Sequence, residues 1–196
     1  MKNSQKPGVL FWSGGKDAWL ALQEIRDHYP DLHLLVTYDE TRGVVPIQEV
    51  PLAAIVKQAD ELGLPLISIP LPPASDNTTY IHTITTTLSQ HQLNQSDLIF
   101  GDLHIREIRQ WREDTFGREG YSCRFPIWEK PYELLFDRLF IPDISIEISS
   151  VDEPYREYLQ PGMPFTRELI SQLPSHIDPM GENGEFHTLV RFNSDE

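Results

Sequence analysis

The chain has 196 residues, 39% of them hydrophobic and 23% charged, which is typical of one sizeable globular domain with room for a small second one. Its 30 acidic against 16 basic side chains give a formal net charge of −14, which disfavours nucleic acid as a partner. No apolar stretch is long enough to cross a membrane, the first residues lack a signal-peptide pattern, and the single cysteine, Cys123, excludes an internal disulfide, so we expect a cytoplasmic protein with no membrane partner.

Strand and helix signals alternate over the first 125 residues. The apolar run Val9–Ser13 predicts a buried strand, and apolar residues at helical spacing predict a helix over residues 16–28. The same two signals repeat three times, with strands at Leu34–Tyr38, Leu64–Leu71 and Leu98–Phe100 and helices over 52–62, around 81–88 and over 103–117. This order predicts an α/β fold, a Rossmann-like parallel sheet with helices on both faces. Ligands of such folds bind at the carboxyl ends of the strands.

The alternation of strand and helix signals changes after about residue 125, where prolines interrupt the chain at short intervals. A helix over Tyr132–Leu139 and strands over Ile144–Ile148 and Phe186–Phe192 are still predicted. We therefore expect two domains, residues 1–125 and residues 126–196, the second being a smaller α+β region that packs on the first.

The segment Ser13-Gly14-Gly15-Lys16-Asp17 follows the first strand and opens the first helix. Its glycines let an anion approach the backbone amides, the helix N-terminus adds a partial positive charge, and Lys16 adds a full one. This combination favours a phosphate-binding loop. The alternative is a tight strand-to-helix turn in which Asp17 is only a first-turn acid.

The segment Gly181–Thr188 gathers two carboxylates, an amide, a hydroxyl and an imidazole within eight residues. The residues that could bind or react with a substrate are Glu182, Asn183, Glu185 and His187. The alternative interpretation is a polar turn that leads into an edge strand.

Together the two segments resemble a known family. The first is similar to the PP-loop of ATP enzymes that release AMP and pyrophosphate, with Ala18 where most members carry Ser or Thr. A PP-loop with Lys-Asp near the N-terminus and Gly-Glu-Asn-Gly-Glu-Phe-His-Thr near the C-terminus is the signature pair of the diphthine–ammonia ligase family. The chain resembles a bacterial-type member, and the resemblance also covers Gly101-Asp102 and residues 120–128.

The resemblance implies a nucleotide α-hydrolase-like domain over residues 1–125 and a substrate-cleft domain over 126–196. ATP would bind through Ser13, Gly14, Gly15, Lys16, Asp17, Gly101 and Asp102, with Asp17 and Asp102 as the acidic partners of Mg²⁺. A carboxylate, on a small molecule or a modified protein, would be adenylated and then attacked by ammonia. Lys16, Asp17, Glu182 and Glu185 would be catalytic, and Glu182, Asn183, Glu185 and His187 would bind the acceptor or ammonium.

Two arginines of the predicted helix over 103–117 share a face with its apolar residues. At 100° per residue, Arg109 and Arg112 project near Ile105 and Phe116. They could pair with acids such as Glu113 or with acids at the strand ends, or they could form an anion clamp that binds substrate.

Two alternative functions stay open. One is a PP-loop tRNA sulfurtransferase, which the single cysteine and the negative charge disfavour. The other is a non-catalytic ATP- or AMP-binding module, which the missing hydroxyl at Ala18 permits. The sequence also leaves open the acceptor, the source of ammonia and whether the chain forms a homo-oligomer.

Overall fold

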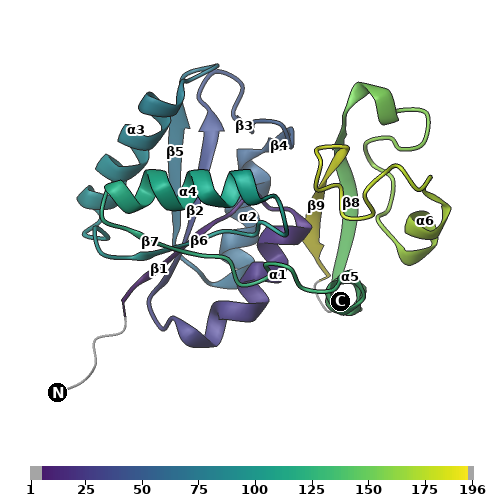
Figure 1. The fold of residues 1–196 in the computed structure, drawn as a ribbon, viewed down its shortest axis with the longest axis horizontal. Helices are drawn as coiled ribbons and strands as arrows, with labels where there is room; N and C mark the ends of the chain where they lie inside the picture. The colour runs from purple at the N-terminus through teal and green to yellow at the C-terminus, as the bar shows by residue number, and fades with distance from the viewer. Residues whose placement is uncertain (1–5, 194–196) are drawn as a thin grey trace.

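Residues 6–193 are described by a computed structural model, in which a sheet of seven strands and a separate two-stranded sheet form two adjoining lobes (Figure 1). The larger lobe contains five parallel strands in the order β5-β2-β1-β6-β7. These are β1 (Gly8–Phe11), β2 (Leu32–Asp39), β5 (Leu66–Leu71), β6 (Asp97–Ile99) and β7 (Ser122–Arg124). The predicted Rossmann-like α/β fold is confirmed.

Three short strands were not predicted from the sequence. The antiparallel strands β3 (Val44–Val45) and β4 (Val50–Pro51) form a hairpin at the end of β2, and β7 pairs with β6 at the sheet edge. Each has only two or three residues, so no alternating pattern could reveal it.

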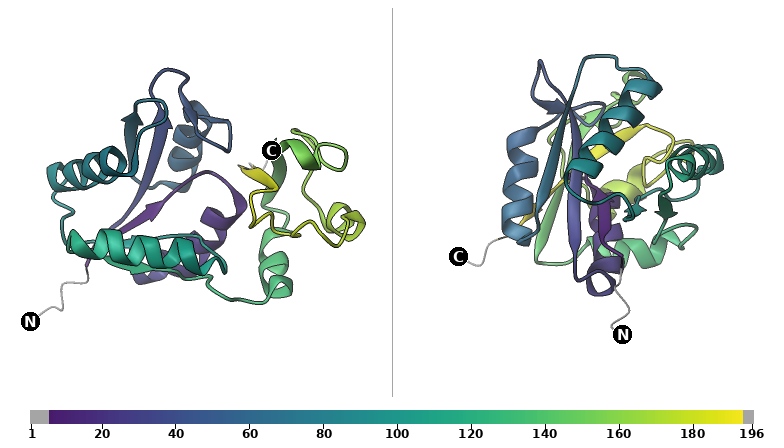
Figure 2. Two further views of the ribbon diagram at one scale, coloured as in Figure 1. Left: turned by 45° about the horizontal axis from the view of Figure 1, so that its top comes forward. Right: turned by 90° about the vertical axis from the view of Figure 1, so that its left-hand side faces the viewer.

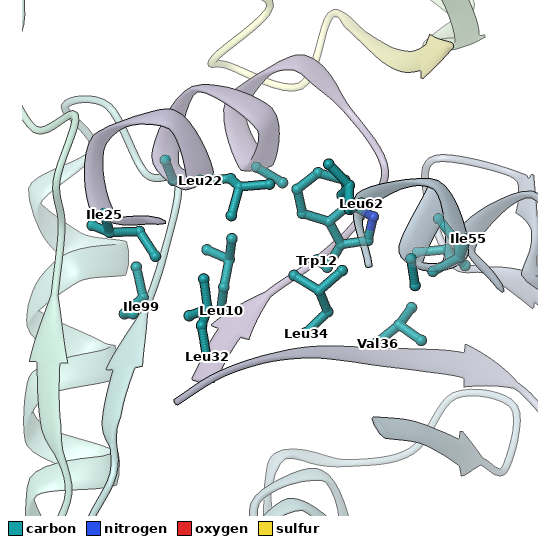
Figure 3. Packing of buried hydrophobic residues seen from close by; sticks show 14 of the residues in the cluster. Leu10, Trp12, Leu22, Ile25, Leu32, Leu34, Val36, Ile55, Leu62 and Ile99 are labelled. Carbon is teal, nitrogen blue, oxygen red and sulfur yellow. The ribbon is translucent and has the colours of Figure 1, made fainter. Parts of the chain in front are cut away.

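Helices cover both faces of the sheet (Figure 2). The helices α1 (Lys16–Ile25) and α2 (Leu52–Leu62) pack on the side chains of Leu10 and Leu34 on one face, as Figure 3 shows. On the other face, α3 (Asn77–Gln90) and α4 (Arg106–Arg118) pack on Val9 and Leu35. Successive residues of a strand point to opposite faces, which is why each strand supplies both cores. None of these helices, nor any other in residues 6–193, is long and apolar enough to cross a membrane.

Two helix boundaries differ from the prediction. The first helix ends at Ile25, and a short 3-10 turn, Arg26–His28, follows it. The helix α4 begins at Arg106 rather than at Leu103, because the amides of Leu103 and His104 bond to the Glu182 carboxylate instead of entering a helix.

The smaller lobe is built on the antiparallel pair β8 (Ile144–Val151) and β9 (Phe186–Phe192), with α5 (Tyr132–Leu139) and α6 (Arg167–Gln172) beside it. Strand β9 belongs to both lobes. Leu189 packs into the core of the larger lobe, whereas its neighbour Val190 packs into the core of the smaller one. The alternation of side chains along β9 therefore joins the two cores.

Gln58 of α2 fixes this junction at the glycine loop. Its side chain is buried; its Oε1 accepts a bond of 2.8 Å from Trp12 Nε1, and its Nε2 donates to the carbonyls of Gly14 (3.0 Å) and Val190 (2.6 Å). The Val190 amide also donates to the Gly14 carbonyl, at 2.9 Å. One side chain thus links α2, the glycine loop and β9.

We predict that Gln58→Leu lowers the free energy of unfolding by about 2–4 kcal/mol, because the substitution leaves the buried Trp12 indole N–H and the Val190 carbonyl without their partners. Urea unfolding would measure this as a lower midpoint at an unchanged slope. The control is Gln172→Leu on the surface, which should change stability by less than about 0.5 kcal/mol. Equal effects of the two substitutions would contradict the assigned role of Gln58.

Candidate functional site

A cleft of about 1470 Å³ lies between the lobes, at the carboxyl ends of the parallel strands. Strands β1 and β6 are neighbours whose following helices, α1 and α4, cover opposite faces, so the chain diverges there and leaves a crevice. The smaller lobe closes the other side with residues 150–152, 181–184 and 186–187. The hairpin β3–β4 reaches across to it, where Ser150 Oγ donates to the Ile47 carbonyl at 2.7 Å. The volume exceeds that of a typical small-ligand pocket.

The glycines of the loop are required by packing. Gly14 has φ +80°, and a Cβ there would lie 2.5 Å from Ile55 Cδ1. A Cβ on Gly15 would lie 2.9 Å from the Thr188 carbonyl oxygen, and one on Gly101 would lie 2.7 Å from that of Asp17. Glycine at these places lets β9 and the end of β6 approach the first turn of α1 closely.

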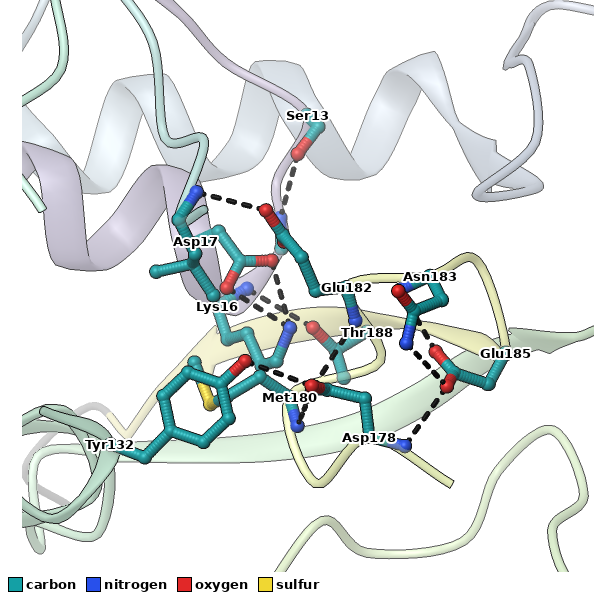
Figure 4. A network of polar contacts seen from close by, with 12 residues as sticks. Ser13, Lys16, Asp17, Tyr132, Asp178, Met180, Glu182, Asn183, Glu185 and Thr188 are labelled. Carbon is teal, nitrogen blue, oxygen red and sulfur yellow. Dashed lines mark hydrogen bonds and ion pairs between the residues drawn. The ribbon is translucent and has the colours of Figure 1, made fainter. Parts of the chain in front are cut away.

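Lys16 and Asp17 line the cleft and are called its floor here, and Figure 4 shows their side chains bonded to each other. A solvent-facing Lys16 would be the simplest phosphate ligand, but its side chain is only 3% exposed, and its Nζ donates to both Asp17 oxygens, at 2.8 and 3.0 Å. About a third of the Asp17 side chain reaches solvent. Desolvation by the surrounding protein still raises the pKa of Asp17; the Asp102 charge raises it further, and Lys16 opposes both.

The two arginines of α4 both form ion pairs, but only one lines the cleft. Arg112 makes a bidentate pair with Asp102, at 2.7 and 3.1 Å, and its guanidinium lies 4.3 Å from the centre of the Phe100 ring. Arg109 pairs with Glu113 at 3.0 Å and contacts the rings of two aromatic residues outside the cleft lining. Arg109 thus has the carboxylate partner that was the alternative to an anion clamp, and this pairing and the ring packing hold it outside the cleft lining.

Glu182, Asn183 and His187 line the cleft. Glu182 Oε1 accepts bonds from the amides of Leu103 (2.9 Å) and His104 (3.3 Å). Burial raises the pKa of Glu182, with a further contribution from the Asp17 charge. Burial also lowers the pKa of His187, helped by the positive charge of Lys16, which favours the neutral form of its imidazole.

Glu185 has a different place from the one expected. It is almost fully buried and does not line the cleft. Its two oxygens accept bonds from the amides of Asp178 (2.9 Å) and Asn183 (3.0 Å) and from the Asn183 side chain (3.1 Å). Glu185 therefore shapes the loop that presents Glu182 and cannot reach a substrate in this conformation.

Asp178, which sequence reasoning missed, shapes the same loop. Its Oδ1 accepts a bond of 2.7 Å from the Met180 amide, and its Oδ2 accepts one of 2.9 Å from the Tyr132 hydroxyl. The signal in the sequence is Asp178-Pro179 two residues ahead of Gly181, a pattern typical of a turn in which the aspartate bonds to the amide two residues on.

The described residues can be compared with what a metal site and a sulfur-carrying cysteine would need. Within residues 6–193, no group of three or more His, Cys, Asp or Glu side chains is arranged to hold a metal ion. The two expected magnesium partners, Asp17 and Asp102, each form an ion pair with a cation. Burial raises the pKa of Cys123 to about 11, so its thiol is protonated at neutral pH and unsuited to carrying sulfur as a nucleophile.

Comparison with known proteins adds little. No family model matches the chain, and no curated protein is significantly similar to it. Among solved structures, it is similar to a predicted subunit of tRNA methyltransferase from Methanocaldococcus jannaschii, with a TM-score of 0.45 and 17% identity over 97% of this chain and 100% of that one. A likeness of this size says nothing of a shared activity.

We predict that glutamine substitution lowers stability at only one of the two glutamates of the loop. Glu185→Gln should lower the free energy of unfolding by about 1–3 kcal/mol. The reason is that the glutamine NH₂ group would point at a backbone N–H, where a carboxylate oxygen now accepts a bond. Glu182→Gln keeps an oxygen for the two amides that it binds and loses the repulsion from Asp17, so stability should stay within about 0.5 kcal/mol. Thermal and urea unfolding would measure both; a neutral Glu185→Gln would show that the carboxylate does not hold the loop.

Proposed function

We propose that the chain is an ATP-dependent carboxylate–ammonia ligase similar to diphthine–ammonia ligases, which splits ATP to AMP and pyrophosphate. The observation that carries the proposal is that the two motifs from opposite ends of the chain meet in one cleft, where Lys16 and Asp17 of the first face Glu182 and His187 of the second. A nucleotide and an acceptor held there would lie next to each other.

The phosphates of ATP fit the floor of the cleft. The first turn of α1 offers backbone amides and the positive end of its dipole. Lys16 would exchange its bond to Asp17 for bonds to phosphate oxygens and stabilise the charge that develops on them. The residues that fit Mg²⁺ are Asp17, which this exchange releases, and Asp102, since Mg²⁺ is usually held by one or two carboxylates together with phosphates. When bound, the ion neutralises phosphate charge.

The adenine fits an open backbone edge of β2. The amide of Trp12 donates to the Leu35 carbonyl at 2.7 Å, after which the chain of β1 turns away. Thr37 lies two residues further along β2, so its N–H and C=O point to the same side, into the cleft, and no backbone partner meets them there within residues 6–193. A donor and an acceptor side by side match the amino group and adjacent ring nitrogen of adenine, whereas guanine presents the reverse order.

The acceptor end would be formed by Glu182, Asn183 and His187. A carboxylate acceptor attacks the α-phosphorus, its oxygen forms the new P–O bond, and pyrophosphate leaves. Ammonia then attacks the acyl carbon, AMP leaves, and the surplus proton goes to a base. Glu182 suits this role because one of its oxygens is held by backbone amides and its raised pKa makes it a better proton acceptor than an exposed carboxylate.

We predict that Lys16→Met weakens ATP binding by about 10- to 100-fold, because the substitution removes a charge-assisted bond to phosphate. Asp17, whose pKa is already raised, can take up a proton when Lys16 is lost, so the fold should survive. Calorimetry with ATP and GTP would measure both affinity and base preference. The control is Lys57→Met, an exposed lysine of α2, and equal ATP affinity of the two variants would overturn the phosphate site.

We also predict that ammonium stimulates release of AMP and pyrophosphate, and that Glu182→Gln lowers this rate at least 100-fold, about 2.7 kcal/mol of transition-state stabilisation. The carboxylate form is the active one, so the wild-type rate should fall as the pH drops through the pKa of Glu182, which lies above the usual glutamate value. The variant should lack this acid limb, while Glu107→Gln on the surface should keep it. ATP binding without ammonium-stimulated release would indicate a binding module instead.

A further inference from the structure

Helix α1 begins without a cap of its own. Its N-cap residue is Gly15, which has no side chain that could accept a bond from the first turn. The amide of Lys16, the first residue of the helix, instead donates to Thr188 Oγ1 at 3.1 Å, a buried bond between residues from opposite ends of the chain. Figure 4 shows Thr188 beside Lys16 at the loop. A strand of the smaller lobe thus supplies the cap that the glycine loop lacks.

The position of Thr188 is strongly determined. The backbone of β9 is fixed against the loop by the bond from the Val190 amide to the Gly14 carbonyl, at 2.9 Å. The Gln58 side chain strengthens this contact, because it donates to the carbonyls of both Gly14 and Val190. The Thr188 carbonyl lies where a Cβ on Gly15 would be only 2.9 Å away. Thr188 is 2% exposed and does not line the cleft, whereas Lys16, Asp17 and Ala18 do. Its hydroxyl therefore contacts the loop from the side away from the cleft.

We propose that Thr188 is a positioning residue for phosphate binding, a proposal that rests on the function proposed above. Its hydroxyl holds the Lys16 amide against β9 and so fixes the orientation of the amides that follow in the first turn, those of Asp17 and Ala18, two residues that line the cleft. The loop has no hydroxyl at Ala18 that could do this from within. Hydrogen bonds weaken steeply when they are misaligned. A first turn of α1 that moves away from β9 would therefore bind phosphate with lower affinity.

The test compares a ligand that has both a base and phosphates with one that has only the phosphates and one that has only the nucleoside. ATP, pyrophosphate and adenosine would be titrated by calorimetry into the wild type, Thr188→Val and Thr188→Ser. Valine keeps the shape and removes the hydroxyl, and serine keeps the hydroxyl. We expect Thr188→Val to weaken ATP and pyrophosphate by about tenfold and to leave adenosine within about twofold. Thr188→Ser should bind all three within about threefold of the wild type.

Several outcomes would overturn the proposal. Unchanged ATP affinity of Thr188→Val would do so, and so would equal losses for ATP and adenosine, which a merely structural role would produce. If Thr188→Val does not fold, hydrogen exchange of the wild type decides: the Lys16 amide should be protected before ATP is added, and an unprotected amide would refute its bond to Thr188.

The same titrations separate this proposal from the proposed function. A wild type that binds neither ATP nor pyrophosphate would overturn the ligase assignment and the role of Thr188 with it. A wild type that binds both, with Thr188→Val binding them equally well, would overturn the role of Thr188 alone.

Discussion

The packing of strand β9 against the glycine loop is the contact on which the rest of the structure depends. It consists of a backbone bond between Val190 and Gly14, the buried amide of Gln58 across both, and the Thr188 hydroxyl on the first amide of α1. A buried polar group without a partner is costly, so each of these bonds depends on the others to keep β9 against the loop. The same contact joins the two hydrophobic cores and sets the two sides of the cleft opposite each other.

The charges of the cleft are arranged in pairs. In a chain of net charge −14, an anion needs local positive groups, and the structure places Lys16 and Arg112 at the floor, each bonded to the carboxylate of Asp17 or Asp102. A desolvated cation without a partner would be unstable, and the pairing avoids that cost. Under the proposed function, an incoming phosphate would replace the carboxylate as the partner of Lys16, and a buried lysine would then be compatible with a phosphate site.

In the C-terminal motif, some residues hold the loop in shape and others line the cleft. Glu185, with Asp178 ahead of the motif, accepts backbone and side-chain bonds and defines the path of the loop. Glu182 and His187 occupy positions on that path that open into the cleft. In sequence the two glutamates look equivalent, three residues apart in the same polar segment. Burial distinguishes them. The Glu185 carboxylate has all its described bonds within the loop, whereas the Glu182 carboxylate reaches across to the residues just before α4.

The sequence by itself determined the alternation of strands and helices, the parallel sheet, the glycine loop at the first strand-to-helix turn and the strand after the C-terminal motif, because periodicity and backbone requirements are local. It did not reveal β7 or the β3–β4 hairpin, which are too short to carry a pattern. Only the tertiary structure decided that Lys16 is buried, that Arg109 lies outside the cleft, and that Gln58 and Thr188 hold the loop. These are properties of contacts between residues far apart in the chain, and burial, which assigns each polar side chain its partner, exists only once the two lobes are packed together.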